Sequence, residues 1–393
     1  MTNKINILIL SHEYPPYYFG GVGTYTKELA EYLSLRFKVY VITGRTARGI
    51  TVERKGSLTI VRVPFPDIPI RSIWYSFSAK EIALRLAEKA TVILANAASA
   101  GYLSRWLYHN SLSRKVITIF HGTVESIKVF YRYANIIYTS LGDLLYYIAL
   151  PVYNSLYRSD LENSTLPISV ARHVSYELIS LYPDLSHKVK NGKTIYAGID
   201  YEKLRSIYLT ARTKHLDKNK IIYAYVGRLY TTKGIIDLLQ VFKLITQNLR
   251  ERVELWIFGK GPMENHIKKF AKKHKLNIKI FGFLEREKLM NILANYIDVL
   301  LFPSYYEGCP LALLEANALG IPAVTWDLPW SHEFIINGLN GFRVPFRDVY
   351  AFAELAINSL KLREYGDIIL KYSSKFNKNY LLNEFVKIII NFY

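Results

Sequence analysis

The hydrophobic positions of the chain form short, almost uninterrupted apolar runs that alternate with longer stretches of helical spacing. The run at 5–11 (INILILS) is followed by a glycine-rich loop, a helical pattern at 24–35 and a second apolar run at 38–44. Continuous apolar runs are typical of strands in parallel sheets, because helices cover both faces of such sheets. The pattern therefore predicts an α/β fold built on parallel sheets.

The same alternation begins again after about residue 200, and we place a domain boundary near 197–207. The length of 393 residues also favours two domains. Two such series predict two doubly wound, Rossmann-like domains that face each other across a cleft. Further strands are predicted at 115–122 and 166–171 in the first half, and at 221–227, 253–259, 278–283, 298–304 and 321–326 in the second.

Composition narrows the class of protein. Half of the residues are hydrophobic and 21% are charged, which excludes a disordered chain. Cys309 is the one cysteine, so an internal disulfide is excluded and a reducing compartment is favoured. The apolar run near the N-terminus is too short for a signal-peptide core, and no stretch approaches about twenty uncharged apolar residues. We therefore expect a cytoplasmic protein.

The formal charge of +19 predicts an acidic partner. Residues 1–200 hold 23 Lys and Arg against 14 Asp and Glu, and residues 201–393 hold 28 against 18, so no basic tail carries the excess. The stretch 266–279 is rich in lysine, but the helical spacing of its apolar residues favours a solvated face over a nucleic-acid site. Because zinc-ligand sets and RNA-binding strand signatures are absent from the sequence, we expect no nucleic-acid partner.

A tyrosine-rich, aliphatic stretch at 129–158 interrupts the alternation, and its part 144–157 carries no charge. Pro151 lies inside it, so the stretch is neither an unbroken helix nor long enough to span a bilayer. Three interpretations stay open: helical packing of the first domain, an apolar groove for an acceptor, or a surface that dips into a membrane.

Glycines follow the first predicted strand, where open α/β sheets bind ligands. Gly20, Gly21 and Gly23 come just before the helix at 24–35, and glycines there let the backbone approach a phosphate. A tight turn explains such a loop equally well. His12 and Glu13 also follow this strand and are candidates for contact with an acceptor.

Two cations follow the strand at 221–227. Arg228 offers a planar fork for phosphate oxygens and Lys233 a compact charge, with glycines on either side of them. The alternative is a pair of surface cations beside a turn. The strand at 253–259 runs into another glycine-lined turn, FGKGPM, which we expect at the same edge of the sheet.

The segment SYYEGCPLALLEA (304–316) sets Glu307 and Glu315 on either side of a helix start. Pro310 is suited to be the first helical residue, because it lacks an N–H and its φ is already helical. A helix that starts after Gly308 would direct its dipole and free amides at an anion. Glu315 lies roughly 7 Å along the axis from that start, about the distance from the phosphates of a nucleotide to its ribose. The glutamates are spaced to bracket a sugar, a diphosphate and a nucleoside.

The order of the segments FGGVGT, FHG, YAGID, GRLYTTKG, FGKGP and EGCPLALLEA resembles that of the GT-B glycosyltransferases of family 4, from residue 5 to about 345. The two glutamates eight positions apart, with an Arg and a Lys upstream, are the most specific element. The resemblance implies a GT-B fold with an acceptor-binding domain at 1–200 and a donor-binding domain at 201–375. It also implies that a last helix at 376–393 crosses back to the first domain.

The resemblance gives roles to residues of the second half. Arg228 and Lys233 match the basic pair that holds the donor diphosphate. Glu315 matches the ligand of the ribose, and Glu307 the carboxylate that contacts the donor sugar. The amides of the segment that runs into the helix face the sugar and the phosphate, and this segment consists of Gly308, Cys309, Pro310 and Leu311.

In the first half, Gly21 and Gly23 match the glycine loop that closes over the donor. His121, in FHG, matches a histidine near the reaction centre of the transferred sugar, although a purely structural histidine is the alternative. The residues expected to act in catalysis are His121, Arg228, Lys233 and Glu307.

The implied activity is transfer of a hexose from a nucleoside diphosphate sugar to an acceptor hydroxyl, with retention of anomeric configuration and without a metal or other cofactor. An Asp-x-Asp motif for a metal-held diphosphate is absent, and Asp160-Leu161-Glu162 comes nearest to it. Two positions depart from the family pattern and put the identity of the donor in doubt: Ala197 replaces an Asn, and Lys260 an acidic residue.

Other functions on the same fold stay open. A nucleotide-sugar epimerase fits the glutamate pair poorly, and no motif for the pyridoxal phosphate of a phosphorylase is found. A non-catalytic nucleotide-sugar-binding subunit is the alternative outside enzymes. The acceptor is a polysaccharide, another soluble glycan or a lipid-linked glycan. Because anionic membranes attract basic surfaces, the charge also predicts peripheral contact with the inner face of the membrane.

Overall fold

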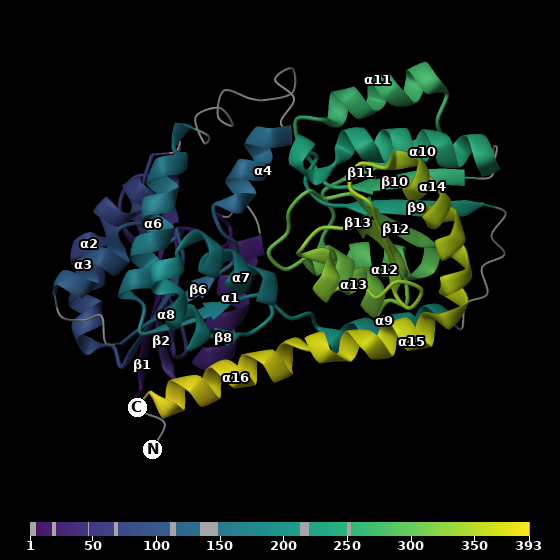
Figure 1. The fold of residues 1–393 in the computed structure, drawn as a ribbon. Helices are drawn as coiled ribbons and strands as arrows, with labels where there is room; N and C mark the ends of the chain where they lie inside the picture. Colours follow the sequence, from purple (N-terminus) through teal and green to yellow (C-terminus); the bar gives the residue numbers. More distant parts are fainter. Residues whose placement is uncertain are drawn as a thin grey trace. The chain divides into compact units, whose positions relative to one another are not determined.

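The computed structural model describes residues 5–17, 21–45, 47–66, 70–110, 115–133, 148–212, 220–249 and 253–392. The chain divides into two compact units, each built on its own sheet (Figure 1). Unit 1 comprises Met1–Lys128, Ser140–Ala197 and Tyr380–Tyr393, and unit 2 comprises Val129–Thr139 and Gly198–Asn379.

Unit 1 contains an eight-stranded sheet in the order β3-β4-β2-β1-β5-β6-β7-β8. Neighbouring strands are parallel except for β3 and β4, which form an antiparallel pair at one edge. The central strands are almost wholly buried, which explains their continuous apolar runs. The strands are β1 (Asn6–Leu10), β2 (Lys38–Arg45), β3 (Thr51–Lys55), β4 (Leu58–Pro64), β5 (Val92–Asn96), β6 (Val116–Phe120), β7 (Leu166–Ser169) and β8 (Lys193–Thr194).

Apolar helix faces cover the sheet of unit 1. On α2, Ala79, Ala83 and Ala87 are fully buried at four-residue spacing, and such small side chains let the helix approach the strands closely. α2 packs on α3, and α3 packs on α6 (Figure 1). The helices of unit 1 are α1 (Gly21–Ser34), α2 (Arg71–Lys89), α3 (Leu103–His109), α6 (Leu150–Asn163), α7 (Arg172–Leu181), α8 (Ser186–Lys190) and, from Tyr380 on, the C-terminal α16 (Lys378–Asn391). Helix α4 (Glu125–Tyr133) starts in unit 1 and passes into unit 2 at Val129.

The C-terminal helix α16 packs on α1 within unit 1. The rings of Tyr25 and Phe385 lie 6.5 Å apart, and the Tyr32 hydroxyl donates a hydrogen bond of 2.6 Å to Oδ1 of Asn383. Contacts between elements so distant in sequence join the end of the chain to its beginning.

Unit 2 contains a six-stranded, wholly parallel sheet in the order β11-β10-β9-β12-β13-β14. Helices α10, α11 and α14 lie on one side of it, and α9, α12, α13 and α15 on the other (Figure 1). The strands are β9 (Ile221–Val226), β10 (Val253–Phe258), β11 (Ile278–Gly282), β12 (Val299–Phe302), β13 (Ala323–Trp326) and β14 (Gly341–Val344). The helices are α9 (Tyr201–Arg212), α10 (Ile235–Leu249), α11 (Glu264–His274), α12 (Arg286–Tyr296), α13 (Leu311–Ala318), α14 (Val349–Asn358) and α15 (Gly366–Ser373).

The predicted α/β class with two parallel sheets is confirmed, and every strand predicted from the apolar runs is present. The prediction missed β3, β4, β5, β8 and β14. It also placed the start of α1 at Thr24, whereas the helix begins at Gly21 and buries Gly23 in its first turn.

The stretch 129–158 falls partly outside the described residues, because 134–147 are not among them. Within the described part, α6 begins at Leu150 with Pro151 in its first turn, so this proline starts a helix and does not interrupt one. Tyr153 and Leu156 of α6 are buried in a hydrophobic cluster, which favours ordinary packing for this part of the stretch. Among the described residues, no helix has the length and apolar character needed to cross a membrane.

A buried carboxyl group connects α6 to the segment after β5. Asp160 is completely buried, and its Oδ2 accepts a hydrogen bond of 2.7 Å from the amide of Ala98. Ala98 has a φ of 57°, in the left-handed region, so this contact holds a backbone turn that an L-residue rarely adopts. Burial raises the pKa of Asp160 to about 7.

We expect the buried Asp160 to make stability fall as pH rises. The folded chain holds the carboxyl proton to about pH 7, whereas the unfolded chain releases it near 3.8, so the stabilisation is lost as pH rises through that window. Asp160→Asn keeps an oxygen for the Ala98 amide and carries no charge. It should therefore be more stable than the wild type at about pH 8, by up to roughly 4 kcal/mol, and by only about a third of that at about pH 5.

Differential scanning calorimetry at both pH values measures this difference. Glu162→Gln, an exposed position on the same helix, is the control for loss of charge alone. A melting-temperature difference between Asp160→Asn and the wild type that does not change with pH would contradict the prediction.

Candidate active site

In unit 2, the residues predicted to bind a donor lie at the point where the order of the strands reverses. The chain runs from β9 outward to β10 and β11, and then returns to add β12 on the other side of β9. Ligands of open α/β sheets bind outside the carboxyl ends of the strands at such a switch point. Arg228 and Lys233 follow β9, and Glu307 follows β12, so all three come from the two strands that flank it.

The turn after β9 is fixed against the end of β12. Lys233 ends a short 3₁₀ turn, Thr231–Lys233, and Gly234 follows with a φ of 71°. A Cβ at Gly234 would lie 1.9 Å from the carbonyl oxygen of Pro303, so only glycine permits this approach. The amide of Tyr305 donates a hydrogen bond of 3.0 Å to the carbonyl of Thr232, which joins the same two segments.

Lys233 and Glu307 form an ion pair across this junction. Lys233 Nζ lies 2.6 Å from Glu307 Oε1 and donates to the carbonyl oxygen of Tyr306 at 3.2 Å. Both side chains are mostly buried, at 19% and 15% exposure, so the charges interact more strongly than an exposed pair would. An ammonium group has three N–H donors, and one of those on Lys233 has no partner among the described residues.

Glu315 lies in the second turn of the short helix α13. The helix begins at Leu311, and Pro310 is its N-cap residue; the expectation that Pro310 is the first helical residue is therefore wrong by one position. The Pro310 carbonyl accepts the amides of Leu313 and Leu314, both at 3.0 Å, and the Leu311 amide donates to the carbonyl of Cys309 at 3.0 Å. The helix start therefore turns sharply after Gly308, which is half-buried.

Glu315 is 7% exposed, and its carboxylate forms an ion pair with Arg286. Arg286 is the first residue of α12, the helix that follows β11. Because a buried carboxylate is unfavourable without a partner, this guanidinium compensates for the burial of Glu315 and holds its side chain in place. Arg286 was missed in the sequence, although inspection of the residues after the strand 278–283 could have found it.

Arg228 lies between two close-packed turns. Its guanidinium carbon is 5.4 Å from the ring centre of Tyr230, and its carbonyl accepts a hydrogen bond of 2.9 Å from the Tyr225 hydroxyl. Gly259, after β10, has a φ of 142°, and a Cβ there would lie 1.9 Å from the carbonyl oxygen of Gly227. The two glycine-lined turns are thus in direct contact at one edge of the sheet, as expected.

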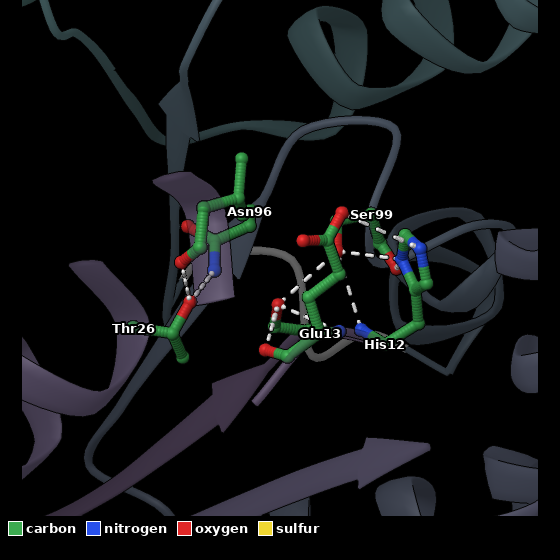
Figure 2. Close-up of polar contacts among 7 residues, drawn as sticks. His12, Glu13, Thr26, Asn96 and Ser99 are labelled. Atoms are coloured by element: carbon green, nitrogen blue, oxygen red, sulfur yellow. Dashed lines mark hydrogen bonds and ion pairs between the residues drawn. The ribbon is translucent and has the colours of Figure 1, made fainter. Parts of the chain in front are cut away.

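Unit 1 has its own switch point between β1 and β5. His12 and Glu13 follow β1, and Ser99 follows β5 (Figure 2). His12 Nδ1 is 2.8 Å from Ser99 Oγ and 3.1 Å from the Ser99 carbonyl, and His12 Nε2 is 3.7 Å from Glu13 Oε1. Burial lowers the pKa of His12, and the Glu13 carboxylate opposes that shift. Ser99 was not singled out in the sequence.

His121 follows β6, beside the end of β5. Its Nε2 lies 2.8 Å from Oδ1 of Asn96, and the ring of Tyr25 packs on it edge to face, with the centroids 4.8 Å apart. Burial lowers the pKa of His121 to about 4, so the imidazole is neutral at pH 7. Gly21 and Gly23, predicted as a loop, belong to the first turn of α1, the helix that carries Tyr25.

The predicted residues therefore form two groups, one at the strand ends of each unit. Arg228, Lys233, Glu307 and Glu315 belong to unit 2, whereas Gly21, Gly23 and His121 belong to unit 1. Within the described ranges, no three or more His, Cys, Asp or Glu side chains are arranged to hold a metal ion.

Comparison with known proteins bears on both halves of the chain. A family model described as glycosyl transferases group 1 matches residues 209–379, and one described as glycosyltransferase family 4 matches residues 19–203. The structure is similar over 99% of both chains to a sucrose-phosphate synthase from Thermosynechococcus elongatus, with a TM-score of 0.77 and 19% identity, which supports the fold.

The curated relatives that the chain matches include glycosyltransferases. The chain is 29% identical over 197 residues to the UDP-Gal:alpha-D-GlcNAc-diphosphoundecaprenol alpha-1,3-galactosyltransferase of Escherichia coli, a match that covers 48% of this chain and about half, 49%, of that protein. It is 23% identical over 353 residues to an uncharacterized glycosyltransferase of Methanocaldococcus jannaschii, over 86% of this chain and 85% of the relative. Because the two family models together span both halves, the chain belongs to the group 1, family 4 glycosyltransferases, which share the GT-B fold.

Proposed function

We propose that the protein is a retaining glycosyltransferase that moves a hexose from a nucleoside diphosphate sugar to an acceptor hydroxyl. The observation that carries the proposal is the Lys233–Glu307 ion pair at the switch point of unit 2. It sets a cation suited to a phosphate beside a carboxylate suited to sugar hydroxyls, on the two strands where such ligands bind.

The donor is held by groups on both sides of this pair. Arg228 and Lys233 neutralise the diphosphate, and the amides at the start of α13 add dipoles of the same sign. Glu315 accepts hydrogen bonds from the ribose hydroxyls, and Arg286 stands beside that sugar through its ion pair with Glu315. Glu307 accepts from hydroxyls of the transferred hexose.

In the proposed reaction the acceptor attacks from the face that the diphosphate leaves. The bond from the anomeric carbon to the phosphate oxygen breaks, and its electron pair stays with the phosphate. The acceptor oxygen forms the new bond and gives its proton to that departing oxygen. Charge therefore grows on the leaving group, where Arg228 and Lys233 stabilise it more strongly than in the ground state. Because these cations meet the charge, we propose that no metal is required.

A lipid-linked glycan is the acceptor class that we propose. The Escherichia coli relative is named for an acceptor carried on diphosphoundecaprenol. Within unit 1, α2 and α3 expose Trp74 at 43%, Phe77 at 59% and Tyr108 at 53%, and the Lys80 ammonium lies 5.0 Å from the ring centre of Trp106. These two helices hold five Lys and Arg against two Glu. A basic surface with exposed aromatic rings fits the interface of an anionic bilayer.

A panel of UDP-, GDP- and ADP-linked sugars, tested by thermal shift in the presence of EDTA, examines the donor site. We expect one nucleotide class to stabilise the wild type. Glu315→Gln should bind that donor at least about tenfold more weakly, because the ribose loses a charged acceptor. Glu354→Gln, an exposed glutamate of α14, is the matched control.

Unchanged affinity of Glu315→Gln would remove the ribose role. Stabilisation that appears only when Mg²⁺ replaces EDTA would refute the metal-free mechanism. A chain that responds to none of the sugars would instead favour a non-catalytic subunit.

Replacement of Lys233 tests the diphosphate role. Lys233→Met keeps the length of the side chain and removes its charge, so kcat for release of the nucleoside diphosphate should fall by about 10²–10³. The assay follows that release with the donor found in the panel. Lys361→Met, at an exposed position of the same unit, controls for loss of surface charge. Turnover within a few-fold of the wild type, in a variant with normal melting temperature, would rule out this assignment.

The membrane surface predicts binding to anionic vesicles. The protein should co-sediment with vesicles that contain phosphatidylglycerol, less so at high salt, and not with pure phosphatidylcholine. Replacing Trp74 and Phe77 together by Ser should weaken this binding at least about tenfold, because both rings leave the interface. The control replaces Tyr350 and Tyr365, exposed aromatic residues of unit 2, by Ser. Equal binding by both double variants would show that α2 and α3 are not the contact.

A further inference from the structure

A chain of hydrogen bonds in unit 1 connects the first turn of α1 to His121. The Thr26 hydroxyl bonds to the Val22 carbonyl at 2.7 Å, one helical turn earlier. Asn96 Nδ2 lies 2.9 Å from Thr26 Oγ1, and Asn96 Oδ1 lies 2.8 Å from His121 Nε2. Figure 2 shows the part of this chain formed by Thr26 and Asn96.

The direction of each bond follows from the chemistry of its ends. A carbonyl oxygen can only accept, so Thr26 gives its single hydroxyl proton to Val22. The Thr26 oxygen must then accept from Asn96, which requires the amide nitrogen of Asn96 to face Thr26. The amide oxygen therefore faces His121, and because this oxygen can only accept, His121 Nε2 must carry a proton.

Burial makes this arrangement rigid. Asn96 is 2% exposed at the end of β5, and Thr26 is fully buried, so water does not compete for the bonds. Asn96 is held further by the pairing of β5 with β6, which sets it opposite Ile119, two residues before His121. The ring of Tyr25, next to Thr26 on α1, packs on the imidazole. The orientation of His121 is therefore set from two adjacent positions of one helix.

The neutral imidazole carries one proton, and the bond to Asn96 places it on Nε2. Nδ1 then holds a lone pair, and no described residue bonds to it. A ring in this state accepts a hydrogen bond but cannot act as an acid, because its one N–H is already used. This suits a sugar hydroxyl, or positive charge that develops at an anomeric carbon, and does not suit a phosphate oxygen.

We propose that Asn96 is a positioning residue that fixes the proton of His121 on Nε2 and thereby makes Nδ1 a dedicated hydrogen-bond acceptor for a sugar hydroxyl. The second part rests on the proposed glycosyl transfer, whereas the first concerns the free protein alone. Asn96 acts through His121 and needs no contact with substrate.

The first test is a long-range proton–nitrogen NMR spectrum of the free protein with ¹⁵N-labelled histidine. Comparison with His121→Gln identifies the signals of His121 among the nine histidines. In the wild type, Nε2 should resonate as a protonated nitrogen and Nδ1 as an unprotonated one from about pH 5.5 to 8. A proton on Nδ1, or titration of the ring near pH 6.5, would overturn the proposal without any assay of activity.

Asn96→Asp keeps the shape of the side chain and adds a carboxylate beside Nε2. An adjacent opposite charge raises the pKa of a histidine by about 1–3 units, so His121 should bind a second proton, on Nδ1, between about pH 5 and 7. Tyr25 is the titratable residue that packs against the ring in both proteins. A His121 spectrum that is the same in Asn96→Asp and the wild type would refute the role of Asn96.

Thr26 supplies a second pair of variants in case Asn96→Asp does not fold. Thr26→Ser keeps the hydroxyl and should preserve the wild-type signals of His121. Thr26→Val removes the hydroxyl that orients the amide, so the Nε2-protonated state should no longer be uniform. Identical His121 spectra for the two variants would contradict the chain of bonds.

The functional part is tested with the donor found in the panel. The ratio of the transfer rate at about pH 8 to that at about pH 6 should rise in Asn96→Asp relative to the wild type, about twofold for a pKa shift of two units and about tenfold for three. Asn358→Asp, exposed in unit 2, is the control for an added charge. A loss of rate that is the same at every pH would reduce Asn96 to a structural residue. If no donor binds, the proposed function fails while the spectra still decide the position of the proton.

Discussion

A parallel sheet brings the carboxyl ends of all its strands to one edge, and the candidate site in each unit depends on that constraint. Residues far apart in sequence, such as Lys233 and Glu307, meet because β9 and β12 are neighbours and end together. The helices that follow the strands begin at the same edge and present their free amides there. Functional residues can therefore be predicted at strand ends from the sequence, before it is known which strands are neighbours.

Because strand ends meet at one edge, charged side chains become partly buried there, which is unfavourable. The two carboxylates of unit 2 illustrate this. Glu315 is buried on the apolar helix α13, and Glu307, which follows β12, is mostly buried. Each carboxylate forms an ion pair with a cation that follows a different strand. These pairs neutralise their charges within the protein, which avoids the larger penalty of isolated buried charges. In the proposed complex, phosphate oxygens join the Lys233–Glu307 pair, and the cation is already oriented when negative charge develops.

The sequence predicted the strands with continuous apolar runs and the residues that follow them, because burial on both faces leaves a local signal. It missed β5 for a physical reason. VILAN is embedded among alanines, from Ala83 and Ala87 before it to Ala97, Ala98 and Ala100 after it, and alanine is the strongest helix former. Asn96 was missed together with its strand.

Other failures arise from tertiary contacts that no local pattern contains. The pairing of Arg286 with Glu315 depends on how the start of α12 lies against α13. The early start of α1 depends on burial of Gly23, which overrides the weak helix propensity of glycine. Thus strand ends were predictable as positions, whereas the partners that orient each side chain were not.

Each unit uses the carboxyl edge of its own sheet, but the two edges differ in charge. Unit 2 gathers charged pairs, Lys233 with Glu307 and Arg286 with Glu315. In unit 1, burial lowers the pKa of His121 to about 4, so this imidazole is neutral at pH 7, and burial lowers the pKa of His12 as well. Neutral rings held by amide and hydroxyl groups can accept hydrogen bonds, and they carry no positive charge that would attract an anion. The proposed acceptor on His121 fits this division, because a neutral imidazole offers a lone pair where a protonated ring would present a charge.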